Sequence, residues 1–377
     1  MIGIVLALFS IATGLILTLA LTNTAKPSGI RPAPYSVNRS EEVPLSSHRT
    51  RSMVATQATT ALMPWGIAFD YVHGFVWVAE PGCDPSTNCP STTAGILGQY
   101  ALSDGNFIQN FNEPGGFSSP LFAAVDTGGH VWFTEPYSHA IGEFDPQHEV
   151  WNQWSVKKGG SPYDLTFDAH GNLWFTEFGA NNIGFFNPKT HTLVENPIPT
   201  PNSNPYGITV DPHGTIWFTE NRNGLGQIAS FTPTLSGIIK ITEHAVNAQR
   251  PHLITSDRAG NIWYSDGFSG DVGKFDPTSG NSKSFQVYTG TCLNPPACTG
   301  THISGIYVDS KGDVWFSDSL SQRVGYLIPS TGQVVAQKLN YNNAHPYDGL
   351  TIDSSDRVWF TEEYALTLTM WPASMVK

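Results

Sequence analysis

The stretch that decides the fold begins at Pro205 and reads PYGITVDPHGTIWFTENRNGLG, ending at Gly226. An apolar segment ends at Asp211 and a glycine turn, and a second segment is centred on Trp217. This order of Pro, Asp, Gly, Trp and Gly recurs along the chain. The equivalent tryptophans are Trp77, Trp132, Trp174, Trp217, Trp263, Trp315 and Trp359.

These tryptophans are 42 to 55 residues apart, and the segments between them are short and lack a helical pattern. A period in the forties with short strands is typical of propeller blades. Each block holds an inner strand, a Trp-containing second strand, a third strand and a more polar outer strand. The sequence therefore predicts an all-β fold, a seven-bladed β-propeller of four-stranded blades, over residues 54–377.

The seventh block ends after its third strand, 365–371, and leaves too little sequence for a fourth. The segment 54–62 precedes the first inner strand and has no block of its own. We expect it to supply the outer strand of blade seven. This N-terminal strand would close the ring and remove the exposed edges of an open sheet.

The first 25 residues carry no charged side chain and are almost wholly apolar. This run is long enough to cross a bilayer but lacks a basic start and a good cleavage motif. Segment 1–25 is interpreted as a signal peptide or as an anchor that attaches the protein to a membrane. Residues 26–53, rich in Pro, Ser and Arg, are predicted to be a flexible tether. Both readings predict a secreted or extracytoplasmic protein.

The composition excludes two classes of protein. Hydrophobic residues make up 40% of the chain and charged residues 13%, which is the opposite of a disordered chain. The formal net charge of −12 argues against nucleic-acid binding, which needs a basic surface. We expect a monomer that binds a small-molecule or peptide ligand on one face.

The cysteines form two Cys-x5-Cys pairs, one in each of the two long intervals between tryptophans. In an exported protein such pairs predict local disulfides that close inserted loops. Zinc is the alternative, although zinc pairs usually have shorter spacing. The predicted disulfides are Cys83–Cys89 and Cys292–Cys298.

Comparison of the blades with one another separates architecture from candidate function. The carboxylates that end the second strands recur in every blade, so we expect them to accept backbone N–H bonds rather than to hold a cation. When the inner strands are aligned on their terminal Asp, one position varies. It is Trp65, Leu121, Tyr163, Tyr206, His252, Ser304 and Asp348 in blades one to seven.

Blades five to seven bring histidines and carboxylates to one arc of this position. His302 and His345 lie beside it, and Asp266 and Asp318 end the second strands of blades five and six. Imidazole and carboxylate groups can bind a divalent metal or transfer protons near neutral pH. The alternative is that these polar residues only line a wet channel.

At these residues the chain resembles the streptogramin B lyase (virginiamycin B lyase) family. The resemblance rests on the repeated Pro-Tyr-Gly-Ile-Thr and Ile-Trp-Phe-Thr-Glu strings and covers 54–371. It implies a seven-bladed propeller that opens a cyclic depsipeptide lactone by Mg²⁺-assisted elimination. A metal would polarise a carbonyl while a histidine removes the neighbouring proton.

Carried over by position, the family pattern is only partly kept. The histidine of its Arg-Pro-His string is His252. Its sixth inner strand reads Glu-Pro-His-Gly-Ile, where Glu binds metal and His is the base. Here His302 stands at the acidic position and Ser304 at the base position. A lone serine is no general base at neutral pH, so His302 would have to take that role.

Two functions follow. The first is a metal-dependent carbon–oxygen lyase or lactonase that acts on a cyclic ester or depsipeptide. Its catalytic residues would be His302 and His252, and its cofactor a divalent metal, Mg²⁺ by resemblance. The alternative is a non-catalytic propeller that binds a ligand or partner, and glycosidase activity is a weaker third because no unique carboxylate pair stands out. The expected metal ligands are His252, Asp318 and Asp348. The expected substrate contacts are Tyr206, Ser304, Tyr347 and Asp348.

Overall fold

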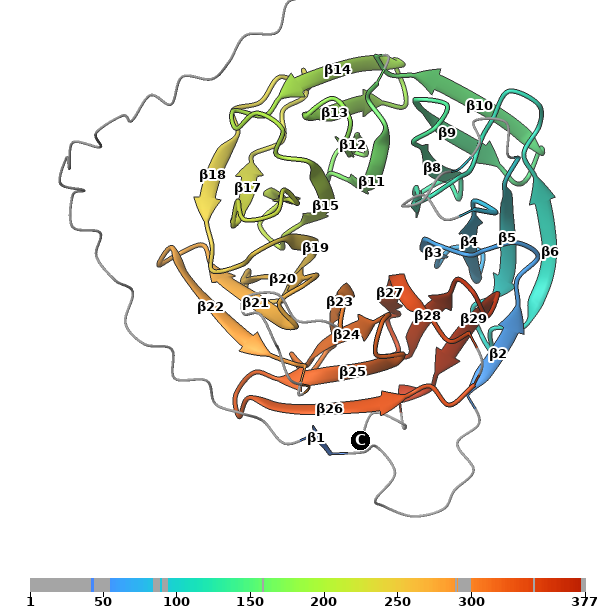
Figure 1. Cartoon of the computed structure of the whole chain (residues 1–377). Coiled ribbons are helices and arrows are strands. Elements are labelled where there is room, and N and C mark those ends of the chain that lie inside the picture. Colours follow the sequence, from blue (N-terminus) through green and yellow to red (C-terminus); the bar gives the residue numbers. More distant parts are fainter. Residues whose placement is uncertain are drawn as a thin grey trace, which may run out of the picture. The chain divides into compact units, whose positions relative to one another are not determined.

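The computed structural model describes residues 42–43, 55–83, 89, 94–157, 159–288, 290, 300–341 and 343–373. All of them belong to one compact unit, Val37–Lys377. Within this part of the chain, seven β-sheets follow one another around a ring, as Figure 1 shows. The predicted seven-bladed propeller of four-stranded blades is confirmed.

The inner strands begin with the proline of the repeat in most blades and are buried or half-buried. An Asp at the end of each strand, or directly after it, caps the following turn. Asp168 is typical: Oδ1 accepts N–H bonds from His170 and Asn172, and Gly171 takes a φ of 77° in the turn. The inner strands are β3 (Ile67–Asp70), β7 (Ala123–Val125), β11 (Pro162–Phe167), β15 (Pro205–Val210), β19 (Pro251–Ser256), β23 (Ile303–Val308) and β27 (Pro346–Ile352).

The second strands are almost entirely buried because neighbouring blades pack on both of their faces. The tryptophans of blades two to seven are also hydrogen-bonded to the Asp of their turn: Nε1 of Trp174 donates to Asp168 at 2.9 Å, and Trp217 donates to Asp211 at 3.0 Å. Nε1 of Trp77 in blade one has no such partner among the described residues. One Asp thus fixes both the turn and the buried indole. The second strands are β4 (Phe75–Glu80), β8 (Val131–Glu135), β12 (Leu173–Glu177), β16 (Ile216–Glu220), β20 (Ile262–Asp266), β24 (Val314–Asp318) and β28 (Val358–Glu362).

The third strands remain largely buried, and the outer strands are more exposed. The third strands are β5 (Ile96–Ala101), β9 (Ala140–Asp145), β13 (Asn182–Asn187), β17 (Gln227–Phe231), β21 (Asp271–Asp276), β25 (Arg323–Ile328) and β29 (Thr367–Trp371). The outer strands of blades one to six are β6 (Phe107–Asn112), β10 (Val150–Ser155), β14 (Thr192–Pro197), β18 (Thr242–Ala245), β22 (Asn281–Gln286) and β26 (Gln333–Lys338).

The ring closes as predicted. β2 (Thr56–Thr59) pairs antiparallel with β29, the last strand, and becomes the outer strand of blade seven (Figure 1). β1 (Glu42–Val43) pairs in parallel with β26 on the outside of blade six. The predicted signal or anchor, 1–25, and the rest of the predicted tether, 26–53, lie outside the described residues. No helix in the described part of the chain has the length and apolar character that a membrane span needs.

Adjacent blades are linked by a repeated side-chain hydrogen bond. Thr176 of blade three donates to the carbonyl of Tyr206 in blade four at 2.7 Å. Thr219 of blade four donates to the carbonyl of His252 in blade five at 2.6 Å. Because the threonine comes from the recurring Trp-Phe-Thr-Glu string, the repeat itself sets the position of the variable residue on the next inner strand.

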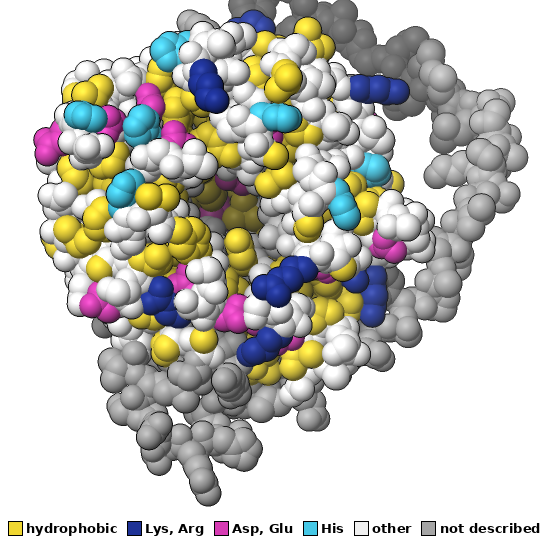
Figure 2. Space-filling view, turned by 180° about the vertical axis from the view of Figure 1, so that it is seen from behind, with side chains coloured by type: hydrophobic (Ala, Val, Ile, Leu, Met, Phe, Trp, Pro, Cys, Tyr) yellow, Lys and Arg dark blue, Asp and Glu magenta, His cyan; other side chains and the backbone are white. Residues whose placement is uncertain are grey.

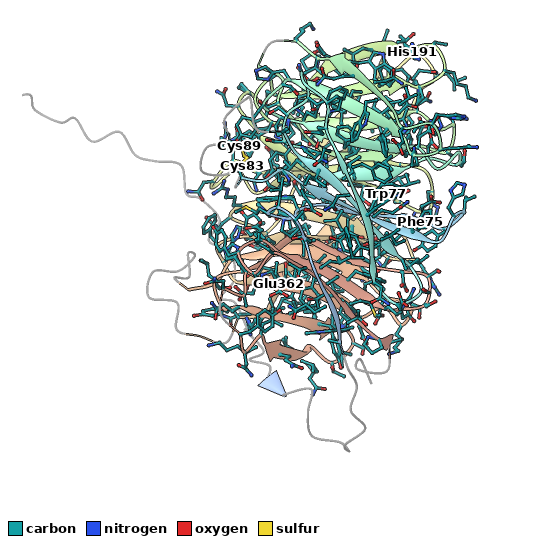
Figure 3. The ribbon with its side chains drawn as sticks, turned by 90° about the vertical axis from the view of Figure 1, so that its right-hand side faces the viewer. Phe75, Trp77, Cys83, Cys89, His191 and Glu362 are labelled. Atoms are coloured by element: carbon teal, nitrogen blue, oxygen red, sulfur yellow. A yellow bond between two sulfur atoms is a disulfide. The ribbon has the colours of Figure 1, made fainter. Side chains whose placement is uncertain are left out.

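The ends of the second strands share one face of the ring with the first cysteine loop. In the side view of Figure 3, Cys83 and Cys89 lie toward the same face as Glu362, and Phe75 and His191 lie toward the other. Cys83 and Cys89 form the predicted disulfide, with their Cα atoms 5.4 Å apart. The predicted Cys292–Cys298 pair lies outside the described residues. Figure 2 shows the other face, where the ring is hollowed at its centre.

Candidate functional site

A cavity of about 680 Å³ opens where the inner strands begin and the second strands end. Its walls are mainly aromatic rings and imidazoles, with Arg250 as the only Lys or Arg among the described lining residues. The cavity extends around more of the ring than the predicted arc of blades five to seven. Blades two, three and four contribute Pro136, Tyr137, Ser161, Tyr163, Phe178 and Tyr206.

A buried hydrogen-bond network joins four blades at the floor of this cavity. The carboxylate of Asp348 in blade seven accepts a bond from Tyr206 Oη at 2.7 Å. Its other oxygen lies 3.0 Å from Nε2 of His252. The hydroxyls of Tyr206 and Tyr163 bond to each other. Burial raises the pKa of both tyrosines well above 10.0, so their hydroxyls stay protonated and can donate.

Asp348 occupies a different position from the one that the alignment predicts. In β23, Ile303 pairs with Asp318 and Ile306 with Phe316, whereas in β27 Pro346 pairs with Glu362 and Leu350 with Phe360. β27 therefore holds one residue more between the same two partners.

Because of this extra residue, Tyr347 takes the position that His252 has in blade five. The carbonyl of Tyr347 accepts the interblade bond from Ser317, just as the carbonyl of His252 accepts one from Thr219. The alignment on the terminal Asp is wrong for blade seven. Asp348 is the added residue, and the bulge that accommodates it brings its carboxylate to Tyr206 and His252.

Both nitrogens of His252 are engaged. Nδ1 lies 3.1 Å from the side-chain nitrogen of Asn221, which can only donate. His252 therefore accepts at Nδ1 and donates from Nε2 to Asp348. Its ring packs on Tyr206 with centroids 4.1 Å apart, and the side chain is almost fully buried.

The predicted metal ligands do not come together as a metal site. His252 and Asp348 bond to each other, and Asp318 is a separate, fully buried carboxylate. Asp318 accepts from Thr301, from the backbone N–H of His302 and from Arg323. Among the described residues, no three His, Cys, Asp or Glu side chains are arranged to hold a metal. These residues do not fit a resident divalent metal.

His302 lies in the cavity wall between two aromatic rings. Its ring is stacked on Tyr347 at 5.1 Å between centroids and contacts Phe268 at 4.9 Å. Burial lowers the pKa of His302 well below 6.5, and the nearby His252, Arg250 and His345 lower it further. The imidazole is therefore neutral at physiological pH, which a base requires.

The two nitrogens of His302 differ in their surroundings. Nδ1 lies 3.5 Å from Ser319 Oγ, and Nε2 has no hydrogen-bond partner in the described part of the chain. Nε2 faces Gly267, where a Cβ would come within 2.8 Å of it. A side chain larger than that of glycine at position 267 would therefore collide with this nitrogen.

Ser304, which the resemblance places at the position of the base, is fully buried. Its hydroxyl lies 3.3 Å from Ser317 Oγ, and its carbonyl accepts from Ser265 at 2.7 Å. Of the four expected substrate contacts, Tyr206 and Tyr347 line the cavity, whereas Ser304 and Asp348 do not. The imidazole available to a ligand in blade six is thus that of His302.

A second variable position, missed by the sequence reasoning, follows each second strand. Asn221 binds His252, Ser319 contacts His302, and the carboxylate of Glu363 lies 2.9 Å from Nδ1 of His345. Gly267 brings no side chain against His302, where a Cβ would lie 2.8 Å from Nε2. Blade-to-blade comparison one residue beyond the recurring Trp-Phe-Thr-Glu string would have found this ring, since it reads Pro81, Pro136, Phe178, Asn221, Gly267, Ser319 and Glu363.

Arg250 is a further site residue that sequence reasoning did not single out. In blades five to seven, the residue just before the inner strand accepts a backbone hydrogen bond at its carbonyl. The donor is the N–H of the residue just after the second strand. The accepting residues are Arg250, His302 and His345. They are therefore equivalent in blades five, six and seven and form one arc above the buried network. Arg250 and His345 both line the cavity with His302.

A model of the virginiamycin B lyase family matches residues 82–297. The match ends just before the sixth inner strand and does not include His302 or Ser304. No curated protein sequence matches the chain.

Solved structures share the fold over most of this chain. Virginiamycin B lyase from Staphylococcus aureus is 22% identical, with a TM-score of 0.68, over 84% of this chain and 98% of that one. A streptogramin B lyase is 21% identical, with a TM-score of 0.69, over 84% and 96%. A catalytically inactive histidine-to-alanine variant of the S. aureus enzyme, with quinupristin, is 23% identical, with a TM-score of 0.69, over 84% and 98%. At these identities the likeness establishes the propeller fold.

Proposed function

The chain belongs to the virginiamycin B lyase family, and we propose that it opens the ester of a cyclic depsipeptide or lactone by elimination. The observation that carries this proposal is the neutral imidazole of His302, which lines an aromatic cavity and whose Nε2 has no hydrogen-bond partner among the described residues. Neutral imidazole is a proton acceptor, and the aromatic walls suit a largely apolar ligand.

In the proposed reaction, His302 Nε2 takes a proton from the carbon next to a carbonyl. The electron pair of that C–H bond forms a C=C bond, and the C–O bond of the ester breaks. The ester oxygen leaves with its electron pair as part of a carboxylate. The imidazolium then returns the proton to water, so that no water is added to the product.

His252, Asp348 and Tyr206 have a positioning role in this proposal. They form a buried network whose donors and acceptors are satisfied. Such a network holds the rings of the cavity floor in place and leaves His252 with no nitrogen for substrate. The sequence prediction of His252 as a catalytic residue is replaced here by a role in supporting the site.

The experiment is a panel of cyclic depsipeptides and lactones, quinupristin included, analysed by mass spectrometry. Elimination leaves the mass unchanged, and hydrolysis adds one water. We expect ring opening without a mass change, and its loss in His302→Ala. The control is His213→Ala, because His213 lies in a turn between the first two strands of blade four. Absence of turnover over the whole panel would reject the proposal.

One observation favours the alternative of a non-catalytic, ligand-binding propeller. The residue at the family's base position, Ser304, is fully buried and hydrogen-bonded. This alternative predicts ligand binding that is insensitive to chelator, with no product from any member of the panel.

We also propose that the protein is monomeric and acts outside the cytoplasm. The Cys83–Cys89 disulfide supports export, because disulfides persist in oxidising compartments. Cell fractionation and the mass of the mature chain would test export and distinguish a cleaved signal from an anchor at 1–25. Retention of the reduced protein in the cytoplasm would contradict this part of the proposal.

A further inference from the structure

We infer that Arg250 binds the carboxylate that leaves during ring opening, and so supplies the positive charge that a metal would otherwise provide. The inference rests on the proposed elimination and names the group that recognises its product. It follows from the contacts that hold the Arg250 side chain, from the guanidinium nitrogens that these contacts leave free, and from the negative charge that forms during the reaction.

The side chain of Arg250 is held on two sides. Its Nε donates to the side-chain oxygen of Asn221 at 2.9 Å and to the Asn221 carbonyl at 3.1 Å. The guanidinium carbon lies 5.0 Å from the centroid of Phe268. Asn221 is itself fully buried and fixed by the Pro251 carbonyl at 2.7 Å. The head group is therefore pre-oriented, which reduces the entropy that binding must overcome.

The two terminal nitrogens of this guanidinium remain available. Arg250 lines the cavity, and within the described residues its side chain bonds only to Asn221 and makes no ion pair with an Asp or Glu. The nearby Asp266 receives the backbone N–H of Arg250 rather than its side chain. A fork of uncommitted N–H groups with a positive charge matches a carboxylate, which it can bind through two parallel hydrogen bonds.

The proposed reaction needs a positive charge in the cavity. The lowered pKa of His302 makes it a weak base, so negative charge must be stabilised elsewhere as the C–O bond breaks. No described set of side chains fits a metal, and His345 is paired with Glu363 at 2.9 Å. Arg250 is the permanent positive charge among the described residues that line the cavity, and His302 is its neighbour in the same arc.

The test compares two probes that differ only in the acid group, N-acetylphenylalanine and its amide. Binding to the whole protein is measured by calorimetry or by NMR of the histidine resonances. The wild type should bind the acid about tenfold more tightly than the amide, as expected for a charge-assisted hydrogen bond. Arg250→Gln should remove this preference, and Arg250→Lys should keep part of it because it keeps the charge without the fork.

The matched control is Arg222→Gln, which removes one positive charge from a half-buried arginine that bonds to the Pro201 carbonyl and does not line the cavity. This variant should keep the full preference for the acid. An equal preference in wild type and Arg250→Gln would overturn the inference. Thermal unfolding of each variant checks that the ring is intact, and Arg250→Lys carries the test if Arg250→Gln does not fold.

Turnover is scored separately, with and without chelator. Ring opening that persists in chelator and falls at least a hundredfold in Arg250→Gln supports the inference. Ring opening that is lost in chelator, restored by Mg²⁺ and unchanged in Arg250→Gln overturns it while the proposed lyase function survives. If nothing on the panel is opened, the lyase proposal fails, and the acid preference still decides whether Arg250 is a carboxylate site.

Discussion

The hydroxyl of Tyr206 donates to the carboxylate of Asp348 over 2.7 Å, although 142 residues separate the two along the chain. They come from blades four and seven, on different arcs of the ring. Asp348 can make this contact because β27 contains one residue more than the other inner strands have at that point. A single added residue thus ties the floor of the cavity together across the centre of the propeller.

Removing the Tyr206 hydroxyl should destabilise the ring. Tyr206→Phe leaves buried Asp348 with one donor fewer, which costs about 1–3 kcal/mol of unfolding free energy. Urea unfolding measures this loss. Tyr71→Phe is the control, because Tyr71 is half exposed and its hydroxyl accepts a single N–H from Ser354. Equal losses in the two variants would contradict a special role for the Asp348 contact.

Covering His302 should stop the chemistry without unfolding the protein. In Gly267→Ala, the new methyl group would lie within 2.8 Å of His302 Nε2, so the imidazole must shift or its Nε2 is blocked. We expect ring opening to fall at least a hundredfold while the melting temperature changes by a few degrees. Gly115→Ala is the control, since a Cβ there meets nothing within 4 Å. Unchanged turnover in Gly267→Ala would remove His302 Nε2 from the mechanism.

The pH profile should reflect the lowered pKa of His302. The active form is neutral, so kcat/KM should stay level from pH 8 down through 6.5 and fall only at lower pH. The unfolded state binds a proton below pH 6.5 that the folded state does not, so stability should also decrease there, by up to about 1.4 kcal/mol per pH unit. A midpoint of the activity profile at or above 6.5 would exclude His302 as the base.

The disulfide should contribute to stability through its short loop. Cys83 and Cys89 are six residues apart, and closing a loop of that length stabilises a fold by about 2 kcal/mol. Replacing both by Ser should lower the urea midpoint accordingly. The response to reductant that remains in this variant reports on the predicted Cys292–Cys298 pair. Peptide mapping that finds four free thiols would contradict both disulfides.

The fold was predictable because each blade repeats the same short sequence pattern and the same local hydrogen bonds. An Asp such as Asp211 fixes its turn and also binds the indole of Trp217. The pattern can therefore be recognised in a single blade, and its recurrence along the chain identifies the propeller fold. Closure by β2 was predictable for a related reason, since the last block lacked an outer strand and 54–62 lacked a block.

The site was predictable only in part. The variable position led to Tyr206 and His252, and the residues beside it led to His302. The alignment missed the extra residue of β27, because a bulge changes no residue type and shows only in strand pairing. Asn221 and Gly267 were missed because the comparison stopped at the end of each second strand. Arg250 was missed because only histidines were singled out at the position that it shares with His302 and His345.

The sequence alone determined the number of blades, the order of strands and the way the ring closes, since these depend on local turns and on a hydrophobic pattern that recurs. Only the tertiary structure decided which variable residues meet. Asp348 reaches Tyr206 and His252 through a strand bulge, and Asp318 is occupied by Arg323, so the predicted metal ligands are kept apart. Contacts across a closed ring depend on small shifts in register and on side-chain direction, and neither is recorded in the spacing of a repeat.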